Sequence, residues 1–524
     1  MPRLTVIAND VAHEIPFSRG ASVREILDAT GLRVRSGCRG NGACGLCLVQ
    51  IEAGEVDDPT KSERLILSPE QLERNTRLAC QLMPEGDLRI RIVDGASKSH
   101  WRELGRDRGD SLRGVSAGLA VDLGTTHISL SLWDLEHGHR LSGRIGLNPQ
   151  FYYGADVVTR LIAAGESASN ARKIARMPLD AVGEALLDMC SRDGLSPRDV
   201  SRVAVVGNTP MLALLTETDS QTLLRPRSWT QPIDCKLDNP GTWVSVMGIH
   251  PEATVEVIPP FAGFVGSDLL AGVLATHLTD HPGGLLIDFG TNSEVALWDG
   301  NTLWVTSAAG GPAFESCEIG CGMPAEPGAI YRVDRQQDCS ELRLQVIGGG
   351  EARGLCGSGL VDLIAFLRGT GDLTRTGKFA APHLKDGFVV QQEGPTIRLT
   401  SRDVDMFQRA KAAVGVGIET LLAMARMSAA ELSRVCVCGA FGQQLNVRNA
   451  QLVGILPDTP PERVELHGNT ALAGCERLLL SPTGAADLAV LRKQAAIISL
   501  SQASDFETLF LENLYLRPLD ADET

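Results

Sequence analysis

Four cysteines have the spacing of a metal-binding set. Cys38, Cys44 and Cys47 follow the pattern C-x5-C-x2-C, and Cys80 supplies a distant fourth thiol. Four thiolates are what a [2Fe–2S] cluster requires, and the glycines at positions 37, 40, 42 and 45 allow the backbone to wrap closely around it. Zinc is the alternative, but zinc sites usually pair two C-x2-C motifs, and Cys80 has no near partner.

A strand that ends in Asp-x-Gly-Thr occurs twice in the chain, at 122–126 and at 288–292. The glycine of each segment lets backbone amides approach phosphate oxygens. Threonine and asparagine side chains add hydrogen-bond donors, and each aspartate can hold Mg²⁺ through water. The sequence therefore predicts two phosphate-binding loops. Their candidate residues are Asp122, Gly124, Thr125 and Thr126 in the first loop and Asp288, Gly290, Thr291 and Asn292 in the second.

Two further features accompany these loops. An apolar strand at 435–438 leads into a Gly-x-x-Gly turn formed by Gly439 and Gly442. Glu294 follows the second loop, and two interpretations of it remain open. Its carboxylate could orient an attacking water, which makes it a catalytic candidate beside Asp122 and Asp288, or it could be a surface residue on the outgoing strand.

The elements that must position the cysteines lie within residues 1–96. Leu4–Ile7 and Val11–Ile15 read as a hairpin, Ser22 can cap a helix that runs to Asp28, and alternating patterns predict strands at 47–51 and 88–92. The charged, apolar-poor segment 97–117 is predicted to be a solvated linker.

From residue 118 onward, apolar strands alternate with glycine turns and amphipathic helices, which indicates an α/β fold. The two Asp-x-Gly-Thr segments suggest a duplicated domain. We place its first half at 118–281 and its second half at 282–524.

Bulk composition narrows the class of protein. The formal net charge of -15 argues against nucleic acid or an anionic membrane as the main partner. No secretory signal and no apolar run of membrane-spanning length are visible, so we expect a cytoplasmic protein. In that compartment, 13 cysteines argue for metal binding rather than a disulfide framework.

Residues 1 to about 95 resemble ferredoxins of the adrenodoxin kind, through the cysteine spacing and the segment Arg77–Gln81. The two phosphate loops, in order with the loop at 439–442, resemble the actin, heat-shock ATPase and sugar-kinase superfamily, in which the third loop binds adenosine. The implied fold is an α+β, ubiquitin-like ferredoxin domain followed by an α/β, duplicated, ribonuclease-H-like ATPase. The implied cofactors are a [2Fe–2S] cluster, ATP and Mg²⁺.

Several further segments resemble one family over nearly the whole chain, the reductive activators of corrinoid proteins. The resemblance implies ATP-dependent, one-electron reduction of Co(II) to Co(I) on a corrinoid protein of a methyltransferase system. It also implies an upstream electron donor, and it is compatible with a homodimer. The segments are 148–150, 154–157, 206–211, 311–315, 355–359 and 468–472.

The chain departs from this family at Ser293, Ser316 and Cys317, where the first two replace an expected glycine and Cys317 follows. These departures leave the details of hydrolysis and docking open. The loops 311–322 and 354–359 are candidate partner surfaces, with internal turns as the alternative.

Two other functions compete with corrinoid activation. One is an ATP-driven electron donor to another metalloenzyme, similar to the activators of 2-hydroxyacyl-CoA dehydratases, but those have no ferredoxin domain. The other is a redox-gated sensor that binds ATP and passes no electron onward.

Overall fold

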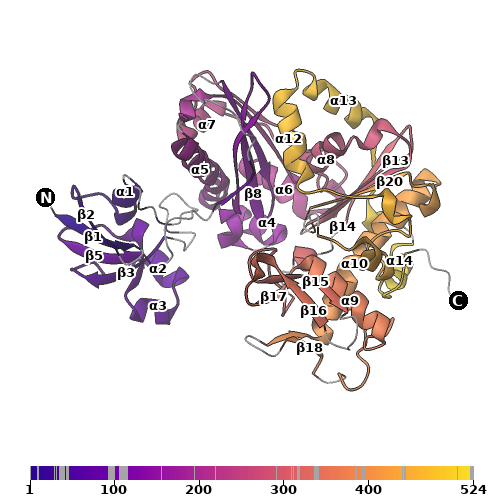
Figure 1. Cartoon of the computed structure of the whole chain (residues 1–524). Helices are drawn as coiled ribbons and strands as arrows, with labels where there is room; N and C mark the ends of the chain where they lie inside the picture. Colours follow the sequence, from indigo (N-terminus) through magenta and orange to yellow (C-terminus); the bar gives the residue numbers. More distant parts are fainter. Residues whose placement is uncertain are drawn as a thin grey trace. The chain divides into compact units, whose positions relative to one another are not determined.

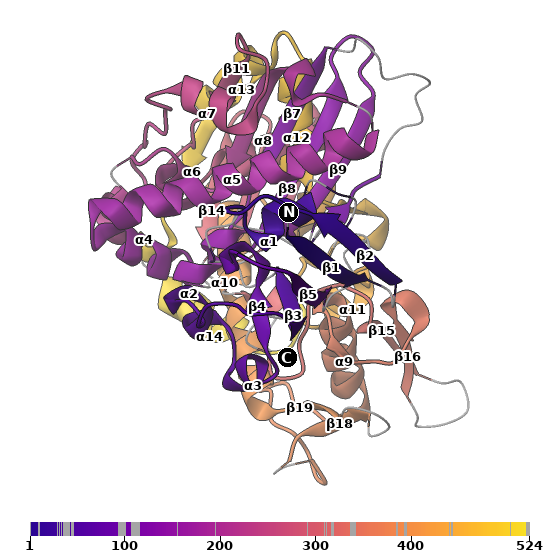
Figure 2. The same cartoon turned by 90° about the vertical axis from the view of Figure 1, so that its left-hand side faces the viewer.

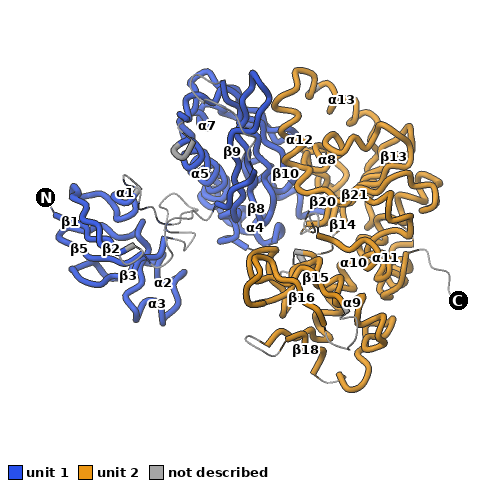
Figure 3. The backbone as a smooth tube through the Cα atoms, viewed as in Figure 1, with its two compact units in different colours: residues 1–225, 234–259 blue, residues 226–233, 260–524 orange. Residues whose placement is uncertain are grey.

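The computed structural model of the chain divides into two compact units, residues 1–225 with 234–259 and residues 226–233 with 260–524 (Figure 3). Cys38, Cys44, Thr291 and Gly442 lie outside the residues that the structure describes. The described residues are 2–8, 11–28, 30, 32, 34, 42, 47–92, 101–105, 116–154, 156–193, 195–218, 220–290, 292–308, 310, 312–315, 319–335, 342–383, 386–391, 396–439, 441, 444–503 and 505–519.

The first unit begins with a small sheet in the order β2-β1-β5-β3-β4 (Figure 1). β1 pairs antiparallel with β2 and parallel with β5, and β3 runs antiparallel to both β5 and β4. The predicted hairpin, helix and two strands are confirmed. The elements are β1 (Arg3–Ala8), β2 (Val11–Pro16), α1 (Val23–Asp28), β3 (Leu48–Ala53), α2 (Lys61–Ile66), α3 (Pro69–Glu73), β4 (Thr76–Leu78), η1 (Ala79–Gln81) and β5 (Leu88–Ile92).

Local sequence explains why these elements form where they do. The Ser22 hydroxyl accepts a hydrogen bond from the Glu25 N–H, and Glu25 accepts one in return from the Ser22 N–H, which caps the start of α1. Alternate residues of β1 and β5, such as Leu4, Val6 and Ile90, are fully buried. The sheet therefore has one apolar face, which packs against α1.

A second sheet in the first unit has the order β11-β10-β7-β8-β9-β6. Helix α5 lies across its strands (Figure 2). Part of the segment predicted as a linker belongs to this sheet, since β6 pairs with β9 and Trp101 is buried. The elements are β6 (Arg102–Glu103), β7 (Ala117–Leu123), β8 (His127–Asp134), β9 (Arg140–Leu147), η2 (Pro149–Tyr153), α4 (Val157–Gly165), α5 (Ala168–Asp193), β10 (Val200–Gly207), α6 (Thr209–Leu215), α7 (Pro240–Met247) and β11 (Thr254–Val257).

The second unit repeats this sheet in the order β21-β20-β12-β13-β14-β22. As in the first unit, three antiparallel strands are followed on one side by two parallel ones. The edge strands differ, because β22 is parallel to β14 whereas β6 is antiparallel to β9. The strands are β12 (Gly284–Phe289), β13 (Ser293–Trp298), β14 (Leu303–Ala308), β20 (Arg434–Gly439), β21 (Val464–Leu466) and β22 (Ala495–Ile497).

Helices cover both faces of this sheet. On one face, α8 packs through Leu269 and Val273 against Leu286 and Cys436. On the other face lies a larger apolar core that includes α9 and α10. The remaining elements are α8 (Ser267–Thr276), η7 (Pro312–Glu315), β15 (Ala329–Arg335), β16 (Leu342–Val346), β17 (Gly354–Leu355), α9 (Gly357–Thr370), β18 (Phe388–Gln391), β19 (Ile397–Leu399), α10 (Ser401–Ala425), α11 (Val447–Leu452), α12 (Thr470–Leu480), α13 (Gly484–Gln494) and α14 (Phe506–Asn513).

Within the described part of the chain, no helix combines the length and the apolar character needed to cross a membrane.

Candidate functional site

Cys47 and Cys80 face each other inside the ferredoxin-type domain. Cys47 precedes β3 and Cys80 lies in η1, and the pairing of Leu48 with Leu78 brings the two segments together. The two Sγ atoms are 3.4 Å apart and both side chains are buried. This distance is too long for a disulfide bond, and it suits two thiolates that bind one metal centre. The pair fits the predicted cluster, whose other two predicted ligands lie outside the described residues.

A buried ion pair fixes the strand that leads to Cys80. Arg77 donates to both carboxylate oxygens of Glu63, at 2.8 Å each, and the Leu78 N–H donates to Glu63 Oε1 at 3.0 Å. Burial raises the pKa of Glu63, but these hydrogen bonds and one from the Thr60 N–H outweigh it and lower the pKa overall. Glu63 therefore stays ionised and connects α2 to β4, the strand that directly precedes the 3-10 helix containing Cys80.

The first predicted phosphate loop connects β7 to β8. Asp122 and Thr125 are buried, and the Gly124 N–H donates to the His127 carbonyl at 3.0 Å. A Cβ atom on Gly124 would lie 2.7 Å from that carbonyl oxygen. Glycine is therefore required by a close backbone approach inside this turn, and the binding of phosphate by the loop stays a prediction.

Two side chains and one backbone N–H from elsewhere in the first unit bind the carbonyl groups of this loop. Asn148 Nδ2 donates to the Gly124 carbonyl at 2.9 Å, Arg160 Nη1 donates to the Thr125 carbonyl at 2.7 Å, and the Asn148 N–H donates to the Thr126 carbonyl at 2.8 Å. In a planar trans peptide, the N–H of the next residue points opposite to the carbonyl. The N–H groups of Thr125 and Thr126 therefore point away from these supports, as phosphate binding requires.

In the second unit, strand register lines up several polar side chains. Asp288 on β12 pairs with Cys438 on β20 and with Glu294 on β13, and Glu294 pairs with Ser307 on β14. Paired residues share one face of a sheet, so the four side chains form a row. Ser307 Oγ donates to Glu294 Oε1 at 3.2 Å. The same face is covered by α8, whose first turn carries Asp268.

The carboxylates of this face repel one another. Burial raises the pKa of Glu294 well above its ordinary value, and the charges of Asp268 and Asp288 raise it further. Burial also raises the pKa of Asp268 to about 6. Among the described residues, the ligand atoms of these three acids do not all lie within 4.8 Å of one another, so a hard divalent cation near them would relieve the repulsion through its charge or through bound water. Glu294 is half-buried and feels the charges of Asp268 and Asp288, which argues against the alternative of a surface residue on the outgoing strand.

The loop after β20 starts at Gly439, which has a positive φ of 80°. A Cβ atom there would collide with the Phe289 carbonyl and with Asp288 Oδ1, so the close approach of this loop to the end of β12 requires glycine. Rings of Phe289, Phe314 and Phe441 pack beneath it, with Phe289 and Phe441 centroids 4.8 Å apart. The strand is placed as predicted, whereas Gly442 and most of the turn lie outside the described residues.

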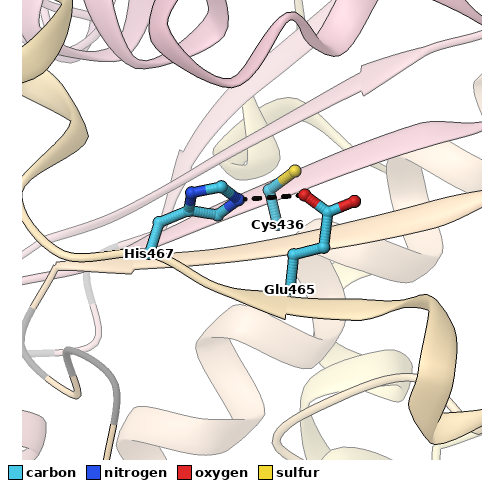
Figure 4. Close-up of side chains that lie close together, drawn as sticks. All are labelled: Cys436, Glu465 and His467. Atoms are coloured by element: carbon cyan, nitrogen blue, oxygen red, sulfur yellow. Dashed lines mark hydrogen bonds and ion pairs between the residues drawn. The ribbon is translucent and has the colours of Figure 1, made fainter.

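Cys436 on β20, Glu465 on β21 and His467 just beyond β21 form a group of potential metal ligands (Figure 4). His467 Nε2 is 3.2 Å from Glu465 Oε2. However, Arg434 already binds both Glu465 oxygens, at 3.1 and 2.5 Å. Burial raises the pKa of Cys436 to about 11, which keeps it a thiol. We interpret the group as an ion-pair network that joins β20 to β21, with Cys436 as buried packing.

Sequence reasoning missed Asp268, Asn148, Arg160 and Asn208 as residues of these sites. Asn208 Nδ2 donates to Thr125 Oγ1 at 3.0 Å, which orients the loop hydroxyl. The segments that contain Asn148 and Asn208 were recognised as family-specific, but their roles were not. A polar residue that begins or borders an apolar helix was the available signal, and it is a weak one.

A ferredoxin-type sheet with a facing cysteine pair, followed by a duplicated sheet whose halves each carry an Asp-x-Gly-Thr loop, defines an iron–sulfur ATPase. Residues 6–85 match the 2Fe-2S iron-sulfur cluster binding domain, residues 117–281 the RACo middle region, and residues 283–524 the C-terminal domain of RACo, the ASKHA domain.

Two curated proteins and one solved structure are similar to the chain. The corrinoid activation enzyme RamQ of Eubacterium limosum is 31% identical over 421 residues, covering 76% of this chain and 70% of that protein. The [Co(II) methylated amine-specific corrinoid protein] reductase of Methanosarcina barkeri is 28% identical over 430 residues, covering 76% of each chain. A structure of a reductive activator for corrinoid, iron-sulfur protein has a TM-score of 0.69 and 26% identity, covering 99% of each chain. The chain belongs to the reductive activators of corrinoid proteins, which confirms the resemblance read from the sequence.

Proposed function

We propose that the protein reduces Co(II) to Co(I) on a corrinoid protein of a methyltransferase system and couples this one-electron transfer to ATP hydrolysis. When bound, the [2Fe–2S] cluster supplies the electron. Cys47 and Cys80, with Cys38 and Cys44, hold the cluster, and the cytoplasm is the compartment that suits such thiols.

The observation that carries the proposal is the presence of two distinct sites in one chain. A buried cysteine pair lies in one domain, and a row of acids around Asp288 and Glu294 lies beside a phosphate loop in another. An electron carrier alone has no use for the second site, and a sugar kinase has no use for the first.

We assign Mg-ATP binding to the two Asp-x-Gly-Thr loops. Backbone amides of Thr125, Thr126 and the 290–292 segment bind phosphate oxygens. Asp268 and Asp288 of the second unit hold Mg²⁺ directly or through water, and Asp122 has the same chemistry at the first loop. Glu294, kept in place by Ser307, orients the attacking water. Gly439 and Gly442 admit the adenosine.

The coupling has a thermodynamic limit. For a one-electron couple each tenfold shift in the equilibrium corresponds to about 59 mV, and ATP can shift it only by binding or turnover that differs between two states of the complex. An upstream donor must return the cluster to its reduced state after each transfer. We include a homodimer as an assembly state, on the family resemblance alone.

The test is an anaerobic spectroscopic experiment. The cluster is reduced, a corrinoid protein held as Co(II) is added, and visible spectra are recorded with and without Mg-ATP. We expect Co(I) to form only when Mg-ATP is present.

Two other outcomes would change the assignment. Co(I) formed equally without Mg-ATP would show that the ATPase does not drive the transfer. No Co(I) with several corrinoid proteins, despite ATP hydrolysis and a reduced cluster, would favour another electron acceptor.

A further inference from the structure

Arg160, on α4, is fully buried and has no carboxylate partner among the residues that the structure describes. Its Nε donates to the Gly154 carbonyl at 2.8 Å, and its Nη1 donates to the Thr125 carbonyl at 2.7 Å. Met211 Sδ lies 3.3 Å from the same Nη1. Nη2 is buried and has no hydrogen-bond partner within the described part of the chain. Such an orphan donor is unusual in a protein interior.

The positive charge of this side chain is not neutralised locally. Burial lowers the pKa of Arg160 to about 10, and the charge of Asp156 opposes this shift. Asp156 itself accepts hydrogen bonds from the Thr159 N–H and hydroxyl, at 2.9 and 2.5 Å, as the cap of α4. At neutral pH Arg160 is therefore a buried cation, which is costly unless an anion offsets it.

The position of Arg160 connects this charge to the first phosphate loop. Its hydrogen bond fixes the peptide between Thr125 and Thr126, so that the Thr126 N–H points away from the arginine. An anion bound by that N–H gains from the dipole of the peptide and from the charge behind it. Water screens this charge little, because the guanidinium is buried.

We propose that Arg160 is a positioning residue for ATP, which holds the Thr125–Thr126 peptide in its phosphate-binding orientation and supplies a fixed positive charge behind it. This inference rests on the proposed function, because it requires that the loop binds nucleotide phosphates. Arg160 does not touch the phosphates, and it acts through the loop.

The test measures ATP affinity by equilibrium binding to the full-length protein with its cluster in place. Arg160→Met should weaken ATP binding by about 10- to 100-fold, the range expected for losing a charged hydrogen bond. Arg160→Lys keeps the charge and loses the fork of donors, so its affinity should lie between those of Arg160→Met and the unaltered protein.

Arg144→Met is the matched control. Arg144 is also a buried arginine of the first unit, but it is paired with Asp188 at 2.8 Å and makes no contact with the loop. The Arg144→Met substitution should lower the thermal stability of the protein while leaving its affinity for ATP unchanged. The far-ultraviolet circular dichroism spectrum should be the same in all variants, which shows that each is folded.

The outcomes distinguish a failure of ATP binding by the protein from a failure of the role proposed for Arg160. If the unaltered protein binds no ATP, the proposed function fails and this inference fails with it. If the unaltered protein binds ATP and Arg160→Met binds it equally well, only the role of Arg160 is wrong. Equal losses of affinity in Arg160→Met and Arg144→Met would also overturn it, since the effect would then be general destabilisation.

Discussion

Asp268 contributes a carboxylate to a face that already carries Asp288 and Glu294, and it accepts a hydrogen bond from the Leu269 N–H beside it at 2.9 Å. Its place in the first turn of α8 suits the helix dipole, and the proposed Mg²⁺ would relieve its repulsion with the other two acids.

Asp268→Asn should therefore raise the Mg²⁺ concentration needed for half-maximal ATPase activity by about tenfold, because a charged ligand or supporting group is lost. The measurement is a Mg²⁺ titration of the ATPase rate. Asp280→Asn, which removes an exposed acid that follows the same helix, should leave the titration unchanged. A Mg²⁺ dependence that is the same in both variants would contradict the role of Asp268.

The buried pair of Cys47 and Cys80 allows a test of the cluster ligands by single-residue substitution. Cys80→Ser removes a thiolate that lies 3.4 Å from Cys47 Sγ, and a [2Fe–2S] cluster held by four thiolates should then be lost or become unstable. The visible absorption of the anaerobically purified protein should disappear, while ATP binding remains. Cys190→Ser alters an equally buried thiol on α5 and should keep the full spectrum. If Cys80→Ser keeps the same spectrum, Cys80 is not a ligand.

At the scale of elements, the C-terminal end of α14 depends on side chains of α10. Lys411 Nζ donates to the carbonyls of Asn513 and Tyr515, at 2.5 and 2.7 Å, and Gln408 Nε2 donates to the Leu514 carbonyl at 2.6 Å. The last carbonyls of a helix have no partner within it, so α10 supplies what α14 lacks.

Lys411 should also give the protein a pH-dependent stability. Burial lowers the pKa of Lys411 to about 7 from its ordinary value of 10.5, so between these values the unfolded chain binds the proton and the folded chain does not. Stability should therefore rise with pH across this window, by up to about 1.4 kcal/mol per pH unit from this group, and the contribution should flatten below pH 7. Denaturant unfolding from pH 7 to 10 should show a smaller slope in Lys411→Met.

The absolute stability of Lys411→Met will also fall, since two carbonyls lose their donor, so the slope with pH is the informative quantity. Lys378→Met, which removes an exposed lysine of the same unit, should leave the slope unchanged. An unchanged slope in Lys411→Met would show that this lysine keeps its proton in the folded protein.

The elements that sequence reasoning placed correctly are those with local causes. The Ser22 cap, the alternation in β1 and β5, and the apolar strand before Gly439 all depend on residues close in the chain. Arg160 and Asp268 could not be predicted, because their partners come from packing. Arg160 donates a hydrogen bond to Thr125, which is 35 residues away in the sequence. The charge of Asp268 acts on Glu294 because α8 covers that face of the sheet. The pairing of β6 with β9 was missed for a similar reason, since a two-residue strand has no periodicity.

At the scale of the whole molecule, the repeated strand order of the two larger sheets explains why a short motif could reveal the duplication. Asp-x-Gly-Thr recurs because each half places a loop after the first strand of its antiparallel set. The cluster domain stands apart from this repeat in both fold and sequence. The molecule thus joins an electron carrier to an ATPase, and its function requires that the two depend on each other.

This dependence can be tested by disabling one site and measuring the other. Asp288→Asn removes a carboxylate from the row on β12, β13 and β20 and should reduce Mg-ATP turnover at least about tenfold. The cluster lies in a separate domain with its own apolar core, so its spectrum and chemical reduction should not change. If ATP drives the electron transfer, Co(I) formation should fall by the same factor as ATP turnover. A variant that loses turnover but still forms Co(I) at the original rate would show that the two activities share a chain without being coupled.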